Sequence, residues 1–337
     1  MKLVIYDPAW PLYEPLLRNS LRTPWEIACA DNDPGWLARQ VNDADALIAL
    51  KLPPELRGAA RRLKIFNFPG AGVMHSRTDE LPEGCALCNV YEHEIPIAEY
   101  TMMAVFLHVT RALDYRETFR RGRWDGNGRI GGEMHDEAWG KTLGLVGYGH
   151  IGQAVAARAQ AFGMKVAAIC EDPGTPLPPG APRPEWLGSQ ADLPRLMAQS
   201  DFLVIACPVT AATLGMIGAR ELALMHPSAV LINVSRAEVV QEEPLFNALR
   251  DGRIAGAALD VWYQYPEEPQ DVLHGSRLPF HELKNVFATP HLSAWTHAMV
   301  ERRMQNIAAN LDRLSRGEPI ERVVFVGTWR AGQAVTA

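Results

Sequence analysis

The chain has 337 residues, a length at which one hydrophobic core usually gives way to two, so we expect two domains. Hydrophobic residues make up 47% and charged residues 21%, which indicates an ordinary globular protein and excludes the disordered and fibrous classes. The net charge of -6 argues against a nucleic-acid partner, because binding a phosphate backbone requires clustered Lys and Arg.

Membrane and secretory functions are not indicated. The most apolar stretch, residues 101–110, is much shorter than the roughly 20 residues that span a bilayer. The first residues lack the apolar run and the cleavage site of a secretory signal, so we expect a cytoplasmic protein without a membrane partner. The five cysteines fit free thiols. Cys85 and Cys88 form a CxxC pair without a second ligand pair at suitable spacing, so no metal site is expected.

The first part of the chain, residues 1–95, has the pattern of a small α/β unit. Short apolar runs at residues 3–6, 46–50 and 64–68 predict buried parallel strands, and a helical segment such as residues 36–41 separates them. We expect this unit to form a domain of its own.

A long apolar helix is predicted next, over residues 97–113. Its side chains are apolar nearly all round, as in a helix buried between domains or subunits, so it marks a candidate domain boundary. Near the other end of the chain, residues 297–316 predict a helix that could return to the first domain, and the fate of the tail from residue 328 is left open.

A second α/β series begins at residue 141 and predicts a doubly wound parallel sheet. It opens with a strand at residues 141–146, a turn at 147–152 and a helix at 153–162. Further strands are predicted at residues 165–170, 202–206, 229–233, 256–261 and 286–288, with a Pro-rich surface loop at 172–184.

The turn at residues 147–152 reads GYGHIG and lies between a strand and a helix, the context that a dinucleotide-binding motif requires. Gly147 would permit the tight turn, Gly149 would let backbone approach a pyrophosphate, and Gly152 would let helix and strand pack closely. Glu171 and Asp172 follow the next strand and offer carboxylates to ribose hydroxyls. The motif therefore predicts NAD binding, and NAD is favoured over NADP.

Several later motifs resemble one enzyme family. Residues 231–240 (LINVSRAEVV), 245–249, 251–262 and 288–293 (ATPHLS) are similar to the motif series of the D-isomer-specific 2-hydroxyacid dehydrogenases, and the similarity in motif order covers residues 68 to about 324. The resemblance implies that Arg236 binds the substrate carboxylate and that His291 is the acid/base.

Chemistry supports the same two residues independently. A guanidinium can hold a planar carboxylate with two parallel hydrogen bonds, as Arg236 would do in a 2-keto acid complex. Reduction of the ketone places negative charge on its oxygen, so a positioned imidazolium such as that of His291 should donate a proton.

The partner of His291 is open at this stage, because the sequence departs from the family pattern. Family members usually place a Glu-Pro pair shortly after the Asp-Val-Phe or Asp-Val-Trp segment. If the sequence is aligned to the family without a gap, Tyr265 occupies the glutamate position, much as formate dehydrogenases of this superfamily carry glutamine there. If three residues are inserted in the alignment, Glu268 occupies that position. We favour Glu268 slightly. Ala237 stands where the family usually has glycine.

The resemblance also implies further site residues. The loop at residues 68–73 is similar to the loop whose amides face the substrate carboxylate, and His93 could line the same cleft. The substrate-binding candidates are Ala71, Gly72 and His93. The remaining cofactor-binding candidates are His150, Ile151, Cys207, Pro208, Thr213, Val234, Asp260 and Ser293, with Asp260 expected to bond the nicotinamide amide.

We therefore expect an α/β protein with two Rossmann-like domains and a cleft between them: residues 1–95 with 297–337 for the substrate, and residues 96–296 for NAD. The expected activity interconverts a small 2-keto acid and its D-2-hydroxy acid, in a homodimer joined partly through the apolar helix. The alternatives are a formate-type dehydrogenase and a weakly active NAD(H)-sensing module. Which acid is used, and in which direction, the sequence leaves open.

Overall fold

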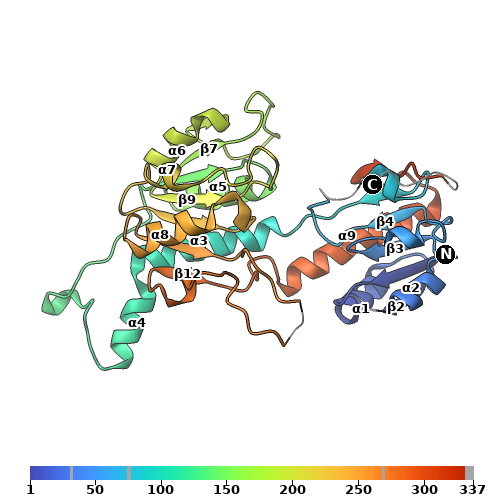
Figure 1. The fold of residues 1–337 in the computed structure, drawn as a ribbon, viewed down its shortest axis with the longest axis horizontal. Coiled ribbons are helices and arrows are strands. Elements are labelled where there is room, and N and C mark those ends of the chain that lie inside the picture. Colours follow the sequence, from blue (N-terminus) through green and yellow to red (C-terminus); the bar gives the residue numbers. More distant parts are fainter. Residues whose placement is uncertain (31–32, 74–76, 268–269, 331–337) are drawn as a thin grey trace. The chain divides into compact units, whose positions relative to one another are not determined.

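The computed structural model describes residues 1–30, 33–73, 77–267 and 270–330. The chain divides into two compact units (Figure 1). Unit 1 comprises Met1–Glu92 and Thr296–Ala337, and unit 2 comprises His93–Trp295. Each unit is described separately below.

Unit 1 is built on a six-stranded sheet in the order β13-β5-β4-β3-β1-β2. Strands β1 to β5 are parallel and follow the flavodoxin-like order 2-1-3-4-5, while β13 pairs antiparallel with β5 at the edge. The strands are β1 (Lys2–Tyr6), β2 (Glu26–Ala30), β3 (Ala46–Ala49), β4 (Ile65–Asn67), β5 (Ala86–Cys88) and β13 (Val323–Val326). The helices are α1 (Trp10–Ser20), α2 (Pro34–Gln40) and α9 (His297–Arg316), with 3-10 turns η1 (Pro54–Leu56) and η2 (Thr78–Glu80).

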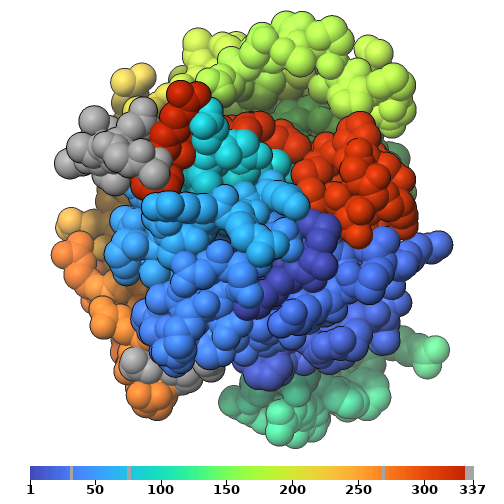
Figure 2. Space-filling model, turned by 90° about the vertical axis from the view of Figure 1, so that its right-hand side faces the viewer, coloured from blue at the N-terminus to red at the C-terminus, as the bar shows by residue number. Residues whose placement is uncertain are grey.

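Helix α9 joins the end of the chain to unit 1, as its sequence predicts. Thr296 caps its start through a side-chain bond to the Met299 amide, and Gly317 ends it with a left-handed φ of 71°. Its Asp312 carboxylate accepts bonds from the backbone amides of Arg22 and Thr23, directly after α1. In Figure 2 the red α9 segment lies against the blue N-terminal segments. The two ends of the chain therefore share one core.

Unit 2 contains a seven-stranded, wholly parallel sheet in the order β12-β11-β10-β9-β6-β7-β8. Numbered from β6, this is the Rossmann order 3-2-1-4-5-6 with one strand added, and the order reverses between β6 and β9. The strands are β6 (Thr142–Val146), β7 (Lys165–Ile169), β8 (Trp186–Gly188), β9 (Phe202–Ile205), β10 (Val230–Asn233), β11 (Gly256–Leu259) and β12 (Val286–Ala288).

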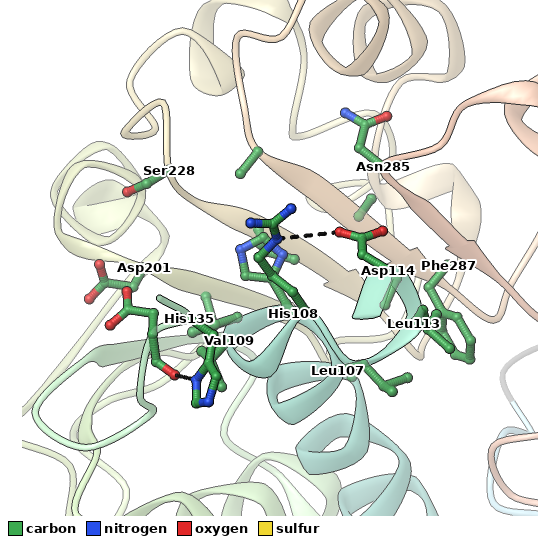
Figure 3. A pocket seen from close by; sticks show the side chains of 18 of the residues that line it. Leu107, His108, Val109, Leu113, Asp114, His135, Asp201, Ser228, Asn285 and Phe287 are labelled. Atoms are coloured by element: carbon green, nitrogen blue, oxygen red, sulfur yellow. Dashed lines mark hydrogen bonds and ion pairs between the residues drawn. The ribbon is translucent and has the colours of Figure 1, made fainter. Parts of the chain in front are cut away.

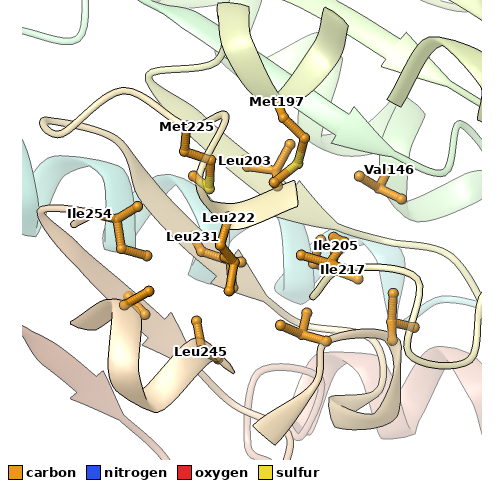
Figure 4. Packing of buried hydrophobic residues seen from close by; sticks show 14 of the residues in the cluster. Val146, Met197, Leu203, Ile205, Ile217, Leu222, Met225, Leu231, Leu245 and Ile254 are labelled. Atoms are coloured by element: carbon orange, nitrogen blue, oxygen red, sulfur yellow. The ribbon is translucent and has the colours of Figure 1, made fainter. Parts of the chain in front are cut away.

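Helices cover both faces of this sheet, as expected of parallel strands that are buried on both sides. On one face, side chains of β6, β9 and β10 pack against α6, α7 and α8 (Figure 4). On the other, α3 and α5 supply the covering layer. The helices are α3 (Glu94–Thr110), α4 (Ala112–Arg120), α5 (His150–Ala161), α6 (Leu193–Gln199), α7 (Ala219–Leu222) and α8 (Glu242–Arg250), with 3-10 turns η3 (Gly128–Ile130), η4 (Gln190–Asp192), η5 (Ala237–Val239) and η6 (Phe280–Glu282).

The apolar helix has the predicted length of 17 residues but starts and ends three residues earlier than its pattern predicts. Helix α3 ends at Thr110 because Arg111 takes a left-handed φ of 48°, and a second helix, α4, starts in a new direction at Ala112. Helix α3 packs mainly against α5, so most of its apolar surface is buried inside unit 2.

No helix in the described part of the chain is long and apolar enough to cross a membrane. The five cysteines are free thiols, and burial raises the pKa of both Cys85 and Cys88 to about 12.

Candidate active site

The glycine turn follows β6 at the carboxyl edge of the unit 2 sheet. Gly147 has a φ of 104°, and a Cβ there would lie 2.7 Å from the Ala206 carbonyl group. A Cβ on Gly152 would collide with the Gly147 carbonyl oxygen, whereas the space beside Gly149 is open. Helix α5 begins at His150, which is exposed, so its first amides face this open space. Two glycines are thus required by packing, and the third leaves room for an anionic group such as a pyrophosphate.

Carboxylates follow the next strand, β7. Glu171 is exposed, and Asp172 accepts bonds from the Gly174 amide at 3.0 Å and from the Thr175 hydroxyl at 2.7 Å. These bonds lower the pKa of Asp172, so a negative charge is fixed at the start of the Pro-rich loop. This is where an adenosine ribose is bound in Rossmann domains.

The turn after β10 carries Arg236, whose guanidinium is exposed. Asn233, buried at the end of the strand, folds this turn: its Nδ2 donates to the Arg236 carbonyl at 3.0 Å and its Oδ1 accepts from the Ser235 amide at 3.2 Å. Arg236 Nη1 in turn donates to the Ser235 carbonyl at 2.7 Å. A side chain at the strand end therefore fixes the backbone that presents the guanidinium.

The loops after β9 and β10 are tied together. The Ser235 hydroxyl donates to the Cys207 carbonyl. Within the β9 loop, Thr213 Oγ1 donates to the Pro208 carbonyl at 2.7 Å, so this loop has a defined shape. The cofactor-binding candidates Cys207 and Val234 are both buried here.

Asp260, after β11, holds the turn that carries His291. Its carboxylate is fully buried and accepts bonds from the Thr289 hydroxyl at 2.6 Å and from the amides of Leu292 and Ser293 at 2.8 and 2.9 Å. Between them, His291 has a left-handed φ of 56°. The Asp260 carboxylate therefore holds the backbone on both sides of His291, and its expected bond to the nicotinamide amide stays a prediction.

A buried tyrosine extends this network. The Tyr100 hydroxyl, on α3, lies 2.6 Å from Thr289 Oγ1. Because Thr289 donates to Asp260, Tyr100 is the donor in its bond to Thr289. The sequence analysis did not identify Tyr100, Asn233 or Thr289 as site residues. Tyr100 could have been noticed as a polar side chain inside the apolar helix pattern. Asn233 and Thr289 could have been noticed because they lie in the same sequence motifs as Arg236 and His291.

Among the residues that the structure describes, Tyr265 is hydrogen-bonded to the His291 ring. Its hydroxyl oxygen lies 2.9 Å from His291 Nδ1 and also accepts a bond from the Trp262 amide at 3.2 Å. The ungapped register thus brings residue 265 to His291. The slightly favoured alternative, Glu268, lies outside the residues that the structure describes.

Electrostatics link these residues. The ring of His291 keeps an exposed edge, but the surrounding protein desolvates it, and this lowers its pKa; the Asp260 charge opposes the shift and the Arg236 charge adds to it. Burial also raises the pKa of Tyr265. Arg236 and His291 are therefore close enough for one charge to influence the other.

The other substrate-binding candidates lie elsewhere in the chain. Ala71 and Gly72 belong to unit 1, where Asn89 Nδ2 donates to the Ala71 carbonyl at 2.9 Å and fixes the loop. His93 is the first residue of unit 2 and is half-buried. Among the described residues there is no cluster of three or more side chains suited to a metal ion.

Comparison with known proteins identifies the family. The family model described as "D-isomer specific 2-hydroxyacid dehydrogenase, NAD binding domain" matches residues 102–293, more than half of the chain. The chain belongs to this family. It is therefore an oxidoreductase, and NAD is its cofactor.

Individual relatives agree with this assignment. A glyoxylate reductase of Thermococcus litoralis is 34% identical over 301 residues, covering 84% of each chain. A D-3-phosphoglycerate dehydrogenase of Methanocaldococcus jannaschii is 32% identical and covers 86% of this chain and 53% of that protein. A solved D-isomer specific 2-hydroxyacid dehydrogenase family protein of Aeromonas salmonicida superposes with a TM-score of 0.77 at 26% identity, covering 96% and 98% of the two chains.

A cavity of this dehydrogenase lies away from its candidate active site. It has a volume of about 820 Å³ and lies at the amino ends of the unit 2 strands, beside Lys141, Asp201 and Asn285 (Figure 3). The residues described above follow the carboxyl ends of the same strands. The end of α3 and the start of α4 also line this cavity, with His108, Arg111 and Leu113 among its residues.

Proposed function

We propose that this dehydrogenase interconverts a small 2-keto acid and its D-2-hydroxy acid with NAD(H). The observation that supports this most directly is the arrangement at neighbouring strand ends: Arg236 after β10, Asp260 after β11 and His291 after β12. It combines a cation for a carboxylate with a titratable proton donor. Relatives named for glyoxylate and 3-phosphoglycerate fit the same substrate class.

The chain's own residues divide the work. Arg236 holds the substrate carboxylate, which fixes the position of the neighbouring carbonyl carbon. His291 gives a proton to the carbonyl oxygen during reduction and removes it during oxidation. Bound NADH supplies the hydride. Asp260 keeps the His291 turn in place, and Tyr265 or Glu268 orients the ring.

We further propose that the enzyme prefers NAD over NADP. The support is the charge after β7, where Glu171 is exposed and the pKa of Asp172 is lowered. Carboxylates accept bonds from ribose hydroxyls and repel a 2′-phosphate. The ratio of kcat/KM for NADH and NADPH tests this, and Glu171→Gln should reduce the preference.

Assembly as a homodimer is part of the proposal. Helix α4 buries none of its residues and exposes Phe119 at 59%. The segment after it exposes further large apolar side chains: Trp124 at 58%, Ile130 at 70% and Met134 at 93%. Such a run is expected to be covered by a partner. A second copy would cover this segment and the cavity at the end of α3.

Five free thiols support a reducing, cytoplasmic location.

The test is NADH oxidation by the purified protein with glyoxylate, hydroxypyruvate, pyruvate, 2-ketoisocaproate and phenylpyruvate, with NAD plus formate as the reverse reaction. Turnover of a keto acid that is lost in His291→Gln supports the proposal. Turnover of formate alone would favour a formate-type dehydrogenase, for which the Tyr265 register is the specific observation. Tight NADH binding without turnover would favour a sensing module.

A further inference from the structure

The Tyr265 hydroxyl has two hydrogen-bonding neighbours with different requirements. The Trp262 amide, 3.2 Å away, can only donate, so the phenol oxygen accepts from it. His291 Nδ1, at 2.9 Å, can accept or donate. The phenol has a single proton, and of these two neighbours only Nδ1 can accept it in a hydrogen bond. A neutral His291 with its own proton on Nε2 then completes the pair.

The charged and titratable groups around His291 come from three segments of unit 2. The buried Asp260 carboxylate is already occupied by the Thr289 hydroxyl and two amides. Arg236, on the turn after β10, adds positive charge, and Glu238 on the same turn acts on Tyr265. Within the described part of unit 2, no carboxylate accepts a hydrogen bond from the His291 ring. Nothing there stabilises the imidazolium in the way a directly bonded glutamate would.

The phenol cannot replace that carboxylate. A neutral hydroxyl offers a dipole and no charge, so it does not offset the desolvation that lowers the His291 pKa, and the Asp260 charge opposes that shift only in part. Burial also raises the pKa of Tyr265, so its proton is held and cannot follow the proton that His291 gives away. The pair can therefore give a proton to the substrate only when His291 is protonated.

We propose that Tyr265 and His291 form a neutral phenol–imidazole pair, in which the hydroxyl donates to Nδ1. Keto-acid reduction then requires the protonated form of His291, while hydroxy-acid oxidation requires the neutral ring with its proton moved from Nε2 to Nδ1. The inference rests on the proposed function for the identity of the reaction. In reduction the imidazolium loses its Nε2 proton to the substrate oxygen, and the neutral ring later regains a proton from water. In oxidation the neutral ring first loses its Nε2 proton to water and gains one from water at Nδ1, which then donates to the Tyr265 oxygen. The unprotonated Nε2 accepts the hydroxyl proton of the substrate.

The pH dependence follows with a definite sign. Reduction should accelerate as the pH falls, with a midpoint below about 6.5, the ordinary value for histidine. Oxidation should accelerate as the pH rises through the same group. The pair favours the neutral ring of His291, whereas a glutamate partner would favour the charged ring.

The direct test is ¹⁵N NMR of the full-length protein labelled at histidine, with the His291 signals assigned from His291→Gln. We expect an unprotonated Nδ1 and a protonated Nε2 at pH 8, and a titration midpoint below about 6.5. Tyr265→Glu should raise this midpoint by at least one pH unit. Tyr265→Phe should remove the preference for one tautomer without raising the midpoint to the value of the glutamate variant.

Glu268→Gln is the matched control, and it should leave the midpoint unchanged. A wild-type midpoint above 7 that drops in Glu268→Gln would overturn the inference, because a carboxylate would then be the partner. Keto-acid and hydroxy-acid kinetics across the same pH range separate the two proposals. If the enzyme turns over a keto acid but Nδ1 is protonated at pH 8, the proposed Tyr265–His291 pair is wrong and the proposed reaction stands. If His291 titrates as expected but no acid is turned over, the proposed reaction is wrong and the pair stands.

Discussion

At the scale of single residues, the site depends on side chains that fix backbone. Asn233 folds the turn that presents Arg236, and Asp260 fixes the turn that presents His291. Neither needs to touch the substrate to affect the rate, because a catalytic group displaced by about 1 Å can lose a hundredfold in rate. Substitution of Arg236 or His291, which would contact the substrate, should therefore have a different effect from substitution of Asn233 or Asp260, which fix the turns that carry them.

Arg236→Lys tests the presenting residue. Lysine keeps the charge but loses the two parallel bonds to a carboxylate, so kcat/KM for the keto acid should fall about tenfold to a hundredfold, mostly through KM. NADH affinity, measured by fluorescence titration, should change less than threefold. A variant that loses NADH binding to the same extent would assign Arg236 to the cofactor instead.

Asp260→Asn tests the fixing residue. The amide nitrogen of asparagine would face the Ser293 or Leu292 amide, so two donors would meet in a buried site. We expect a loss of about 2–3 kcal/mol in the free energy of unfolding, measured by urea denaturation, together with a lower kcat. Asp172→Asn is the control, because that carboxylate also accepts hydrogen bonds, two against the three of Asp260, but is exposed, so the free energy of unfolding should change little. Equal losses in both variants would contradict the role of Asp260.

At the scale of elements, the turn from β6 into α5 separates packing from binding. Gly152 faces the Gly147 carbonyl, whereas Gly149 faces open space with a φ of -78° that alanine adopts easily. One element thus contains a glycine required by the fold and a glycine that only a ligand would require.

Gly149→Ala should leave stability within about 0.5 kcal/mol of the wild type and weaken NADH binding at least tenfold, because the methyl group occupies the space that a pyrophosphate would need. Gly152→Ala should lower the thermal midpoint as well, because the collision is with backbone. Isothermal titration and thermal unfolding of both variants check this. Unchanged NADH affinity in Gly149→Ala would move the pyrophosphate site away from this turn.

At the scale of the whole molecule, the candidate catalytic residues and the cavity beside α3 and α4 lie at opposite edges of the unit 2 sheet. The cavity edge carries α4 and the exposed apolar segment that follows it. Phe119 and Trp124 pack edge to face with ring centroids 5.4 Å apart, yet more than half of each side chain is exposed. Assembly and catalysis can therefore be altered separately.

Phe119→Ser combined with Trp124→Ser should convert a dimer into a monomer. Size-exclusion chromatography with light scattering at micromolar concentration measures the change. Leu214→Ser is the matched control, because Leu214 is 61% exposed but lies in the loop after β9, at the other edge of the sheet. A dimer that survives the double substitution, or a monomeric wild type, would contradict the proposed interface.

The sequence by itself determined the fold class, the family and the strands of the unit 2 sheet from β6 to β12 except β8. These strands are continuous apolar runs, and the glycine spacing reports a local turn whose geometry depends on neighbouring residues alone. Helix α9 was also predicted at its observed bounds from its helical pattern, and in the structure Thr296 and Gly317 cap its two ends.

Only the tertiary structure revealed the edge strands, the end of α3 and the environment of His291. Strands β2, β8 and β13 are three to five residues long and partly or largely exposed, so a short apolar run such as VVFV in β13 did not mark them as sheet strands and only their pairing does. Helix α3 ends where Arg111 takes a left-handed conformation, which no local pattern of apolar residues reveals. The contact of Tyr265 with His291 and the use of the Asp260 carboxylate join residues 26 or more positions apart, and such hydrogen bonds depend on loop conformations that only the assembled sheet fixes.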